Sequence, residues 1–338
     1  MRQYAEEVLS FSYRLANPHL TPVPGGLSTV NFAVEHDGTD RFFIKLYPPG
    51  SNLASEQAAI EIARFVHAGG IPTAEPVPDK TGAFLHVGHG RAVSVWSFIE
   101  GHNGANVALD GHTLEGAGAL LGRTHRRLAC WPGPVSRAGG DWCDLPRLRD
   151  TMTDMKIRLR GARHLSGPLR SRATEVLNWR EQRLDEVAAT LRSMPVPTIQ
   201  VLHGDCTERN FIFRSGAGPA LIDFRAPHRW PIWWELARIG CAVPAILSGD
   251  AHIGALARCI TAYRECNDEI PVADLMAVAQ AARCYTTASV TPFQDLVAPG
   301  PVMSVPALAD YIEQRHVAVV ALWDRADDYD EALREALR

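Results

Sequence analysis

The chain has 338 residues, of which 46% are hydrophobic and 21% are charged, a composition that excludes disordered and collagen-like proteins. Lysine and arginine number 34 against 38 aspartates and glutamates, so the net charge is −4 and the basic excess typical of nucleic-acid-binding proteins is missing. We therefore expect no nucleic-acid partner. No apolar run approaches the roughly 20 residues of a membrane-spanning helix, so we expect no membrane span either.

The N-terminal segment MRQYAEEVLS contains two glutamates where a secretion signal would have a positive flank and an apolar run. This pattern predicts a cytoplasmic protein. The first hundred residues carry most of the strand signals. Four segments there are predicted to be strands: residues 30–35, 41–47, 83–87 and 91–99.

The first two of these strands flank the pair Asp37-Gly38, which favours a tight reversal and therefore predicts a hairpin. Residues 53–68 show helical periodicity and end at Gly69, an appropriate helix stop. A small sheet with one helix is therefore predicted for the N-terminal part of the chain.

Helical periodicity dominates after Gly101. Predicted helices cover residues 109–128, 148–160 and 169–191, and helices resume from Ile232 to the C-terminus. One β-like island, residues 199–224, interrupts them. The pattern predicts an α+β protein with two domains: residues 1–100 form a small β-rich N-terminal lobe, and residues 101–338 form a larger helical C-terminal lobe.

The island contains the residues best suited to catalysis. The string HGDCTERN includes Asp205 and ends at Asn210, and the string LIDF, after a glycine-bearing turn, includes Asp223. A hairpin centred on Gly216-Ala217 would place Asn210 and Asp223 opposite each other at its open end. An amide oxygen beside a carboxylate suits Mg²⁺, and Asp205 can accept a proton from an attacking hydroxyl.

These motifs resemble those of the aminoglycoside phosphotransferase and choline kinase family, which are small-molecule kinases with a protein-kinase-like fold. In that family His-Gly-Asp stands where protein kinases have His-Arg-Asp, and Ile-Asp replaces Asp-Phe-Gly. The resemblance implies a bilobal protein-kinase-like fold with Asp205 as the catalytic aspartate. It also implies that Asn210 and Asp223 hold Mg²⁺ against the phosphates of ATP, with GTP left open as the nucleotide.

The N-terminal lobe offers matching nucleotide-binding residues. Gly25 and Gly26 precede the first strand, where glycines let backbone N–H groups approach phosphate oxygens, and Ser28 or Thr29 can add a hydroxyl. A simple turn is the alternative interpretation of these glycines. Lys45 lies among apolar residues in the next strand, and the resemblance implies that it pairs with the nucleotide phosphates.

Such a lysine needs a carboxylate to hold it. Glu56 shares the inward apolar face of its helix and is therefore predicted to be the partner of Lys45, whereas Glu61 points elsewhere and is predicted to be solvated. The backbone groups of Ser97 and Ile99 are predicted to form hydrogen bonds with adenine. The alternative there is an edge strand that stops at a glycine.

Other features allow structural and functional interpretations. His203 is predicted to brace the catalytic loop by hydrogen bonding, and Arg225 stands where protein kinases have glycine. Trp230, Trp233 and Trp234 suit either the core or stacking on an acceptor. The acidic side chains between residues 324 and 331 suit a solvated helix face or a cationic acceptor.

We therefore expect an ATP-dependent phosphotransferase that acts on a hydroxyl of a small molecule. An antibiotic of aminoglycoside, peptide or nucleoside type is the first acceptor expected, and a metabolite such as homoserine, choline or a sugar is the alternative. A third interpretation is a non-catalytic nucleotide-binding module that regulates a partner. The presence of Lys45, Asp205, Asn210 and Asp223 argues against that third interpretation. The sequence leaves the oligomeric state open.

Overall fold

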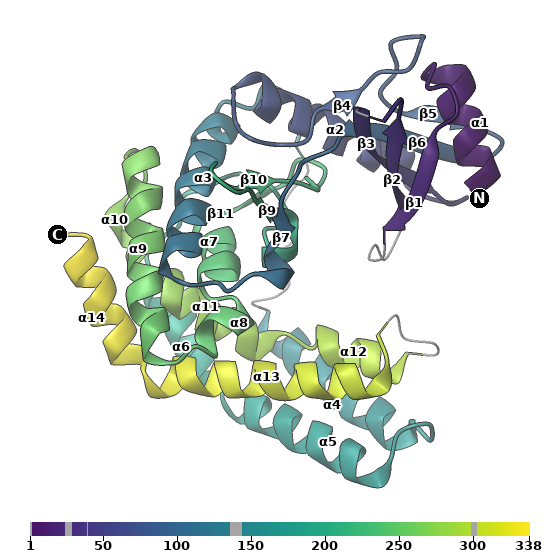
Figure 1. Cartoon of the computed structure of the whole chain (residues 1–338). Helices are drawn as coiled ribbons and strands as arrows, with labels where there is room; N and C mark the ends of the chain where they lie inside the picture. The colour runs from purple at the N-terminus through teal and green to yellow at the C-terminus, as the bar shows by residue number, and fades with distance from the viewer. Residues whose placement is uncertain (1, 24–28, 39, 136–143, 299–302) are drawn as a thin grey trace. The chain divides into compact units, whose positions relative to one another are not determined.

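The structure, a computed structural model, describes residues 2–23, 29–38, 40–135, 144–298 and 303–338. The chain forms two compact units, whose elements are labelled in Figure 1. The first unit comprises Met1–Val107, Arg123–Ser136 and Val201–His228. The second comprises Ala108–Gly122, Arg137–Gln200 and Arg229–Arg338.

The first unit contains a six-stranded antiparallel sheet with strand order β1-β2-β3-β6-β4, in which β5 also pairs with β6. Its strands are β1 (His19–Val23), β2 (Val30–His36), β3 (Asp40–Tyr47), β4 (Pro76–Val77), β5 (His86–Gly88) and β6 (Arg91–Ser97). The β2–β3 pairing confirms the predicted hairpin. Asp37 and Gly38 both have positive φ, which lets the chain reverse there.

Two helices of the N-terminal segment pack in this unit. Helix α1 (Arg2–Ser12), which the sequence patterns did not predict, places Ala5 and Leu9 in one apolar core with Leu20, Ile44 and Val95 of the sheet (Figure 1). Helix α2 (Leu53–Ala68) has the predicted bounds. Its N-terminus is capped because the side chain of Asn52 accepts a hydrogen bond from the Ser55 N–H at 3.2 Å.

A second, three-stranded sheet in the same unit has the order β10-β9-β7. Its strands are β7 (His102–Asn103), β9 (Phe211–Phe213) and β10 (Ala220–Leu221). Because β7 pairs with β9, the predicted catalytic loop belongs to the unit that contains the N-terminal sheet. The division inferred from the sequence, at residue 100, instead grouped that loop with the C-terminal lobe.

The register of the β9–β10 hairpin differs by one residue from the prediction. Leu221 lies opposite Phe211, and the Ile222 N–H donates to the Asn210 carbonyl at 2.9 Å. Asn210 is therefore opposite Ile222 and not opposite Asp223. A further hydrogen bond, from the Leu221 N–H to the Pro72 carbonyl at 3.0 Å, ties the hairpin to the loop that follows α2.

The second unit is mainly helical, with one two-stranded sheet. Helix α3 (Gly111–Ala129) belongs to this unit up to Gly122. The helices that follow it are α4 (Leu145–Gly161), α5 (Gly167–Gln182), α6 (Leu184–Ser193), α7 (Trp233–Gly240), α8 (Val243–Ile246), α9 (Asp250–Cys266), α10 (Val272–Met276), α11 (Val278–Ala288), α12 (Thr291–Val297), α13 (Val305–Asp324) and α14 (Ala326–Ala336). The sheet pairs β8 (Ile199–Val201) with β11 (Arg229–Pro231). The single helix predicted for residues 169–191 is wrong, because the chain breaks at Arg183 into α5 and α6.

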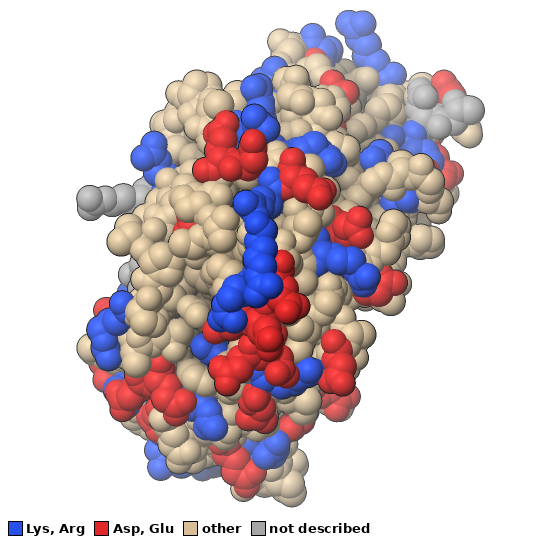
Figure 2. Space-filling view, turned by 90° about the vertical axis from the view of Figure 1, so that its left-hand side faces the viewer, with Lys and Arg blue, Asp and Glu red and all other residues tan. Residues whose placement is uncertain are grey.

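Helices α4, α5, α12 and α13 share one apolar core, which includes Met152, Val176, Phe293 and Ile312. None of the helices in the described part of the chain is both long and apolar enough to cross a membrane. Acidic and basic side chains lie next to one another on the face shown in Figure 2. Among the described residues, Arg325 pairs with Asp250 at 2.6 Å and with Asp328 at 3.0 Å.

Candidate active site

His203 braces the loop that carries the predicted catalytic aspartate, as the sequence predicts. Its ring is fully buried. The Asp205 N–H donates to Nδ1 at 3.2 Å, so Nε2 carries the proton of the neutral ring and donates to the Ile222 carbonyl at 2.8 Å. The imidazole therefore links the loop to the end of the β9–β10 hairpin.

Asp205 is held at both its backbone and its side chain. Its carbonyl accepts from Nδ2 of Asn210 at 2.7 Å, and its Oδ2 accepts from a guanidinium N–H of Arg225 at 3.0 Å. The side chain is only about one quarter exposed, at 26%. A carboxylate with partial access to solvent can act as a proton acceptor.

Asn210 ends the short 3-10 helix η3 (Glu208–Asn210) and is 8% exposed. Because its Nδ2 donates to the Asp205 carbonyl, its Oδ1 points away from that bond and is available as an acceptor. This orientation presents an amide oxygen of the kind that hard cations prefer.

Asp223 follows directly on the residue that pairs with Asn210. It has a φ of +65°, a left-handed conformation that is uncommon for residues other than glycine. Its carboxylate forms an ion pair with the ammonium of Lys45, which extends from the central strand β3. Burial acts to raise the pKa of Asp223, but the Lys45 ammonium and then Arg225 outweigh it and hold the pKa below its ordinary value.

Glu56 does not contact Lys45 in the structure. Among the described residues, the carboxylate that pairs with Lys45 is that of Asp223. Glu56 instead lies close to the hydroxyl of Tyr47: burial raises the pKa of Tyr47, and the Glu56 carboxylate raises it further. The predicted ion pair between Lys45 and Glu56 is therefore not the one observed. Asp223, from another part of the first unit, pairs with the Lys45 ammonium instead.

The remaining nucleotide-binding predictions fall at the start of β2 and the end of β6. Gly25, Gly26 and Ser28 lie outside the described residues. Thr29 is described, and its hydroxyl donates to the Asn31 side chain at 2.9 Å. Its role toward phosphate stays a prediction.

Of the two residues predicted to bind adenine, Ser97 already uses its N–H, which donates to the Glu75 carbonyl at 2.8 Å. Within the described part of the chain, neither backbone group of Ile99 has a hydrogen-bond partner. Ile99 is therefore the better candidate, because its peptide groups remain available to a ligand.

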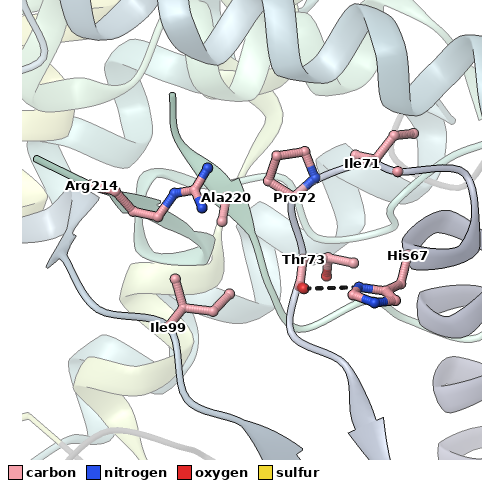
Figure 3. A pocket seen from close by; sticks show the side chains of 8 residues that line it. His67, Ile71, Pro72, Thr73, Ile99, Arg214 and Ala220 are labelled. Carbon is pink, nitrogen blue, oxygen red and sulfur yellow. Dashed lines mark hydrogen bonds between the residues drawn. The ribbon is translucent and has the colours of Figure 1, made fainter. Parts of the chain in front are cut away.

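The side chain of Ile99 faces a pocket of about 330 Å³ (Figure 3). Arg214 and His67 lie on opposite sides of this pocket, and a ring nitrogen of His67 lies 3.4 Å from the Thr73 carbonyl. Four candidate site residues do not line this pocket: Lys45, Asp205, Asn210 and Asp223. It is thus separate from the groups suited to phosphoryl transfer.

The donor set fits a magnesium ion bound together with phosphates. The described residues contain no group of three or more His, Cys, Asp or Glu side chains arranged to hold a metal by themselves. Mg²⁺ does not require such a cage, since it is usually held by one or two protein oxygens together with phosphate oxygens and water. The amide of Asn210 and the carboxylate of Asp223 are two candidate oxygens of this kind, and the hydrogen bond from the Ile222 N–H to the Asn210 carbonyl brings the two chain segments together.

Comparison with known proteins agrees with this chemistry. A family model described as the phosphotransferase enzyme family matches residues 19–265, a range that includes every described residue of the site. The chain belongs to the phosphotransferase enzyme family. No curated protein is similar enough in sequence to match the chain.

Solved structures show that the fold is the one used by small-molecule kinases. A spectinomycin phosphotransferase, solved with ADP and spectinomycin, has a TM-score of 0.69 at 15% identity and covers 95% of this chain and 98% of its own. A microcompartment-associated aminopropanol kinase has a TM-score of 0.64 at 16% identity and covers 97% and 99%. Choline kinase from Cryptosporidium parvum Iowa II has a TM-score of 0.61 at 11% identity and covers 100% and 99%.

The sequence indicates no task for Arg225, which stands out only because protein kinases have glycine there. One signal was available: Arg225 follows two residues after Asp223, and a long cationic side chain so close to a predicted metal-binding carboxylate is well placed to pair with a nearby acid. The structure shows that the acid contacted is Asp205.

Proposed function

We propose that this protein is an ATP-dependent O-phosphotransferase that transfers the γ-phosphoryl group to a hydroxyl of a small molecule. The observation that carries the proposal is the ion pair between Lys45 and Asp223, together with Asp205 on a loop that His203 braces and Arg225 contacts. Phosphoryl transfer needs positioning and charge neutralisation more than covalent chemistry, and this arrangement supplies both.

Each residue then has a stated task. Lys45 exchanges its contact with Asp223 for the phosphates of ATP, and Ile99 offers backbone groups to adenine. Asp205 takes the proton of the acceptor hydroxyl as that oxygen bonds to the γ-phosphorus, while the bond from the γ-phosphorus to the ADP oxygen breaks. ADP and the phosphorylated acceptor leave, and Asp205 gives its proton to water.

Asn210 and Asp223 would hold Mg²⁺, which neutralises phosphate charge when bound. The amide of Asn210 is already oriented for this task by its donation to the Asp205 carbonyl. Release of Asp223 from Lys45 frees a carboxylate oxygen for the ion. The pKa of Asp223 lies below its ordinary value, so this carboxylate is ionised at neutral pH.

We propose an antibiotic as the acceptor. Two of the structural relatives are named for antibiotics: the spectinomycin phosphotransferase and an amicoumacin kinase, which was solved with AMP-PNP and Ca²⁺ and has a TM-score of 0.65. The second candidate is a metabolite kinase, which the aminopropanol and choline kinase relatives favour.

The test is a panel of acceptors incubated with the full chain, ATP and Mg²⁺, with mass spectrometry to detect an added phosphate. The panel includes aminoglycosides, spectinomycin, peptide and nucleoside antibiotics, amino alcohols, homoserine and sugars, and a parallel series replaces ATP with GTP. A phosphorylated antibiotic supports the first candidate and a phosphorylated metabolite supports the second. If the chain binds nucleotide but phosphorylates nothing, the regulatory-module interpretation replaces both.

The matched control is Asp205→Asn, which keeps the size of the side chain but removes the base. We expect nucleotide affinity within about threefold of the wild type and a loss of turnover of at least about 100-fold, the usual contribution of general base catalysis. Isothermal titration gives the affinity, and ADP release gives the rate. Unaltered turnover in this variant would remove Asp205 from its assigned role.

A further inference from the structure

Arg225 reaches the catalytic aspartate from a backbone position that is itself fixed. Its N–H donates to the His203 carbonyl at 2.9 Å, so the residue is paired with the start of the catalytic loop. A Cβ atom at Gly204 would lie only 2.7 Å from the Cβ of Arg225. Gly204 therefore lets the two segments approach closely enough for the guanidinium to contact Asp205 at 3.0 Å.

The guanidinium lies among several carboxylates. Burial acts to lower the pKa of Arg225, but Asp223, Asp205 and Glu56 outweigh it and raise the pKa above its ordinary value. The side chain is half exposed, at 51%, so an ion pair serving stability alone would contribute little. The placement of the contact is thus better explained by what it does to Asp205.

We propose that Arg225 is a positioning residue for phosphoryl transfer: by donating to Oδ2 of Asp205, it holds the carboxylate in the orientation that accepts the proton of the acceptor hydroxyl. This inference rests on the proposed function. His203 and Asn210 hold the backbone of Asp205, and Arg225 holds its carboxylate. The bond from Arg225 selects one carboxylate orientation, and proton transfer to a base depends steeply on such alignment.

Four variants of the full chain separate positioning from structure. Arg225→Gln removes the cation, Arg225→Lys keeps it on a shorter side chain, Arg225→Ala leaves room for added guanidinium, and Arg64→Gln is the control. Arg64 lies on α2 in the same unit, with its guanidinium carbon 3.9 Å from the centre of the Phe84 ring. The rate is measured with the acceptor found by the panel, or as ATP hydrolysis with water as the acceptor.

Arg225→Gln is expected to lower kcat about 10- to 100-fold while the KM for ATP changes less than about threefold, because the lost contact is to the base and not to the nucleotide. Arg225→Lys should retain about tenfold more turnover than Arg225→Gln. Millimolar guanidinium chloride should partly restore kcat in Arg225→Ala without changing its melting temperature. Arg64→Gln should match the wild type in both kcat and the KM for ATP.

The outcomes distinguish this inference from the function on which it rests. If the wild type neither phosphorylates an acceptor nor hydrolyses ATP, both fall. If the wild type is active and Arg225→Gln keeps wild-type kcat, only the role of Arg225 is overturned. A parallel loss of kcat and thermal stability in all Arg225 variants, with no rescue by lysine or guanidinium, would also overturn it in favour of a structural role.

Discussion

Asp223 occupies a backbone conformation that constrains what can replace it. With a φ of +65°, the residue sits in the left-handed region, which costs most side chains roughly 1–2 kcal/mol but is tolerated by Asp and Asn. The conformation turns the carboxylate toward Lys45. The backbone conformation and the proposed role of the carboxylate therefore both limit which residues can replace Asp223.

The Asp223→Asn and Asp223→Ala variants separate these two effects. Both lose the carboxylate and should lose Mg²⁺-dependent turnover, but only alanine adds backbone strain. We expect Asp223→Ala to be less stable than Asp223→Asn by about 1 kcal/mol, measured as the free energy of unfolding in urea. Equal stabilities would show that the left-handed conformation is not maintained.

The candidate site residues Asp205, Asn210 and Asp223 are close together in the sequence, so local spacing was enough to predict that one loop and one hairpin carry them. Their catalytic and metal-binding roles stay predictions. The partner of Lys45 was predicted as Glu56 because both belong to the N-terminal segment, whereas the structure pairs Lys45 with Asp223, 178 residues away. Arg225 was overlooked as a functional residue because its contact with Asp205 depends on how the loop and the hairpin approach each other.

Glycines set the distance between two helices of the second unit. A Cβ atom at Gly118 of α3 would lie 2.1 Å from the Cys259 carbonyl oxygen of α9, and one at Gly122 would lie 2.6 Å from the Tyr263 carbonyl oxygen. Both contacts are with backbone, which cannot move aside as a flexible side chain can. The glycines recur at a spacing of four, on one face of α3.

Gly118→Ala should therefore destabilise the protein by about 3 kcal/mol, at the upper end of the range for overpacking. The matched control is Gly254→Ala in α9, where the added Cβ would meet nothing within 4 Å. There the better helix propensity of alanine should stabilise by up to about 1 kcal/mol. Thermal denaturation compares the two, and a neutral Gly118→Ala would contradict the close approach of the helices.

Arg172 of α5 and Glu313 of α13 form a two-point ion pair, with N–O distances of 2.8 and 2.9 Å. The hydrogen bond from Arg172 holds the pKa of Glu313 below its ordinary value. The stability that this pair supplies is therefore complete above the ordinary glutamate pKa of about 4.3, and it is lost as the pH falls below that value through the lowered pKa.

Glu313→Gln should lower the free energy of unfolding by no more than about 1 kcal/mol at pH 7, since both side chains are partly exposed. The difference from the wild type should shrink as the pH falls from about 5 toward 3. Glu331→Gln, which removes a carboxylate that makes no ion pair with a described residue, is the control in the same urea titrations. A difference independent of pH would mean that the pair does not act through charge.

Elements were predicted well where periodicity and punctuation agreed. Helix α2 begins after Asn52 and ends before Gly69, and both ends were predictable. The break between α5 and α6 falls at Arg183, where neither glycine nor proline marks it. The predicted β9–β10 register was wrong by one residue. A short glycine-bearing turn allows two pairings, and only contacts in the folded chain select one of them.

For the molecule as a whole, the division of the chain depends on contacts between distant segments. The pairing of His102 with Phe213 joins the catalytic loop and hairpin to the unit that holds Lys45. No local sequence pattern predicts a pairing between segments so far apart in the chain. The α+β class, by contrast, was predictable, because strand signals concentrate near the N-terminus and helical signals near the C-terminus.

Nucleotide binding should stabilise the folded chain as a whole. ATP with Mg²⁺ at 100 times its dissociation constant should add about 2.7 kcal/mol to the free energy of unfolding. Lys45→Met and Asp223→Asn should each show much less of this gain, since each removes a group proposed to bind the phosphates or the metal. Differential scanning calorimetry measures the shift, and an equal gain in all three proteins would place the nucleotide elsewhere.

The most direct test of the active-site assignment is the position of the metal. Crystals of the full chain grown with AMP-PNP and Mn²⁺ in place of Mg²⁺ allow the ion to be found from its anomalous scattering. The peak is predicted within about 2.5 Å of the side-chain oxygens of both Asn210 and Asp223, with Asp205 close by but not a ligand. A nucleotide-bound metal ion that contacts neither Asn210 nor Asp223 would contradict the assignment.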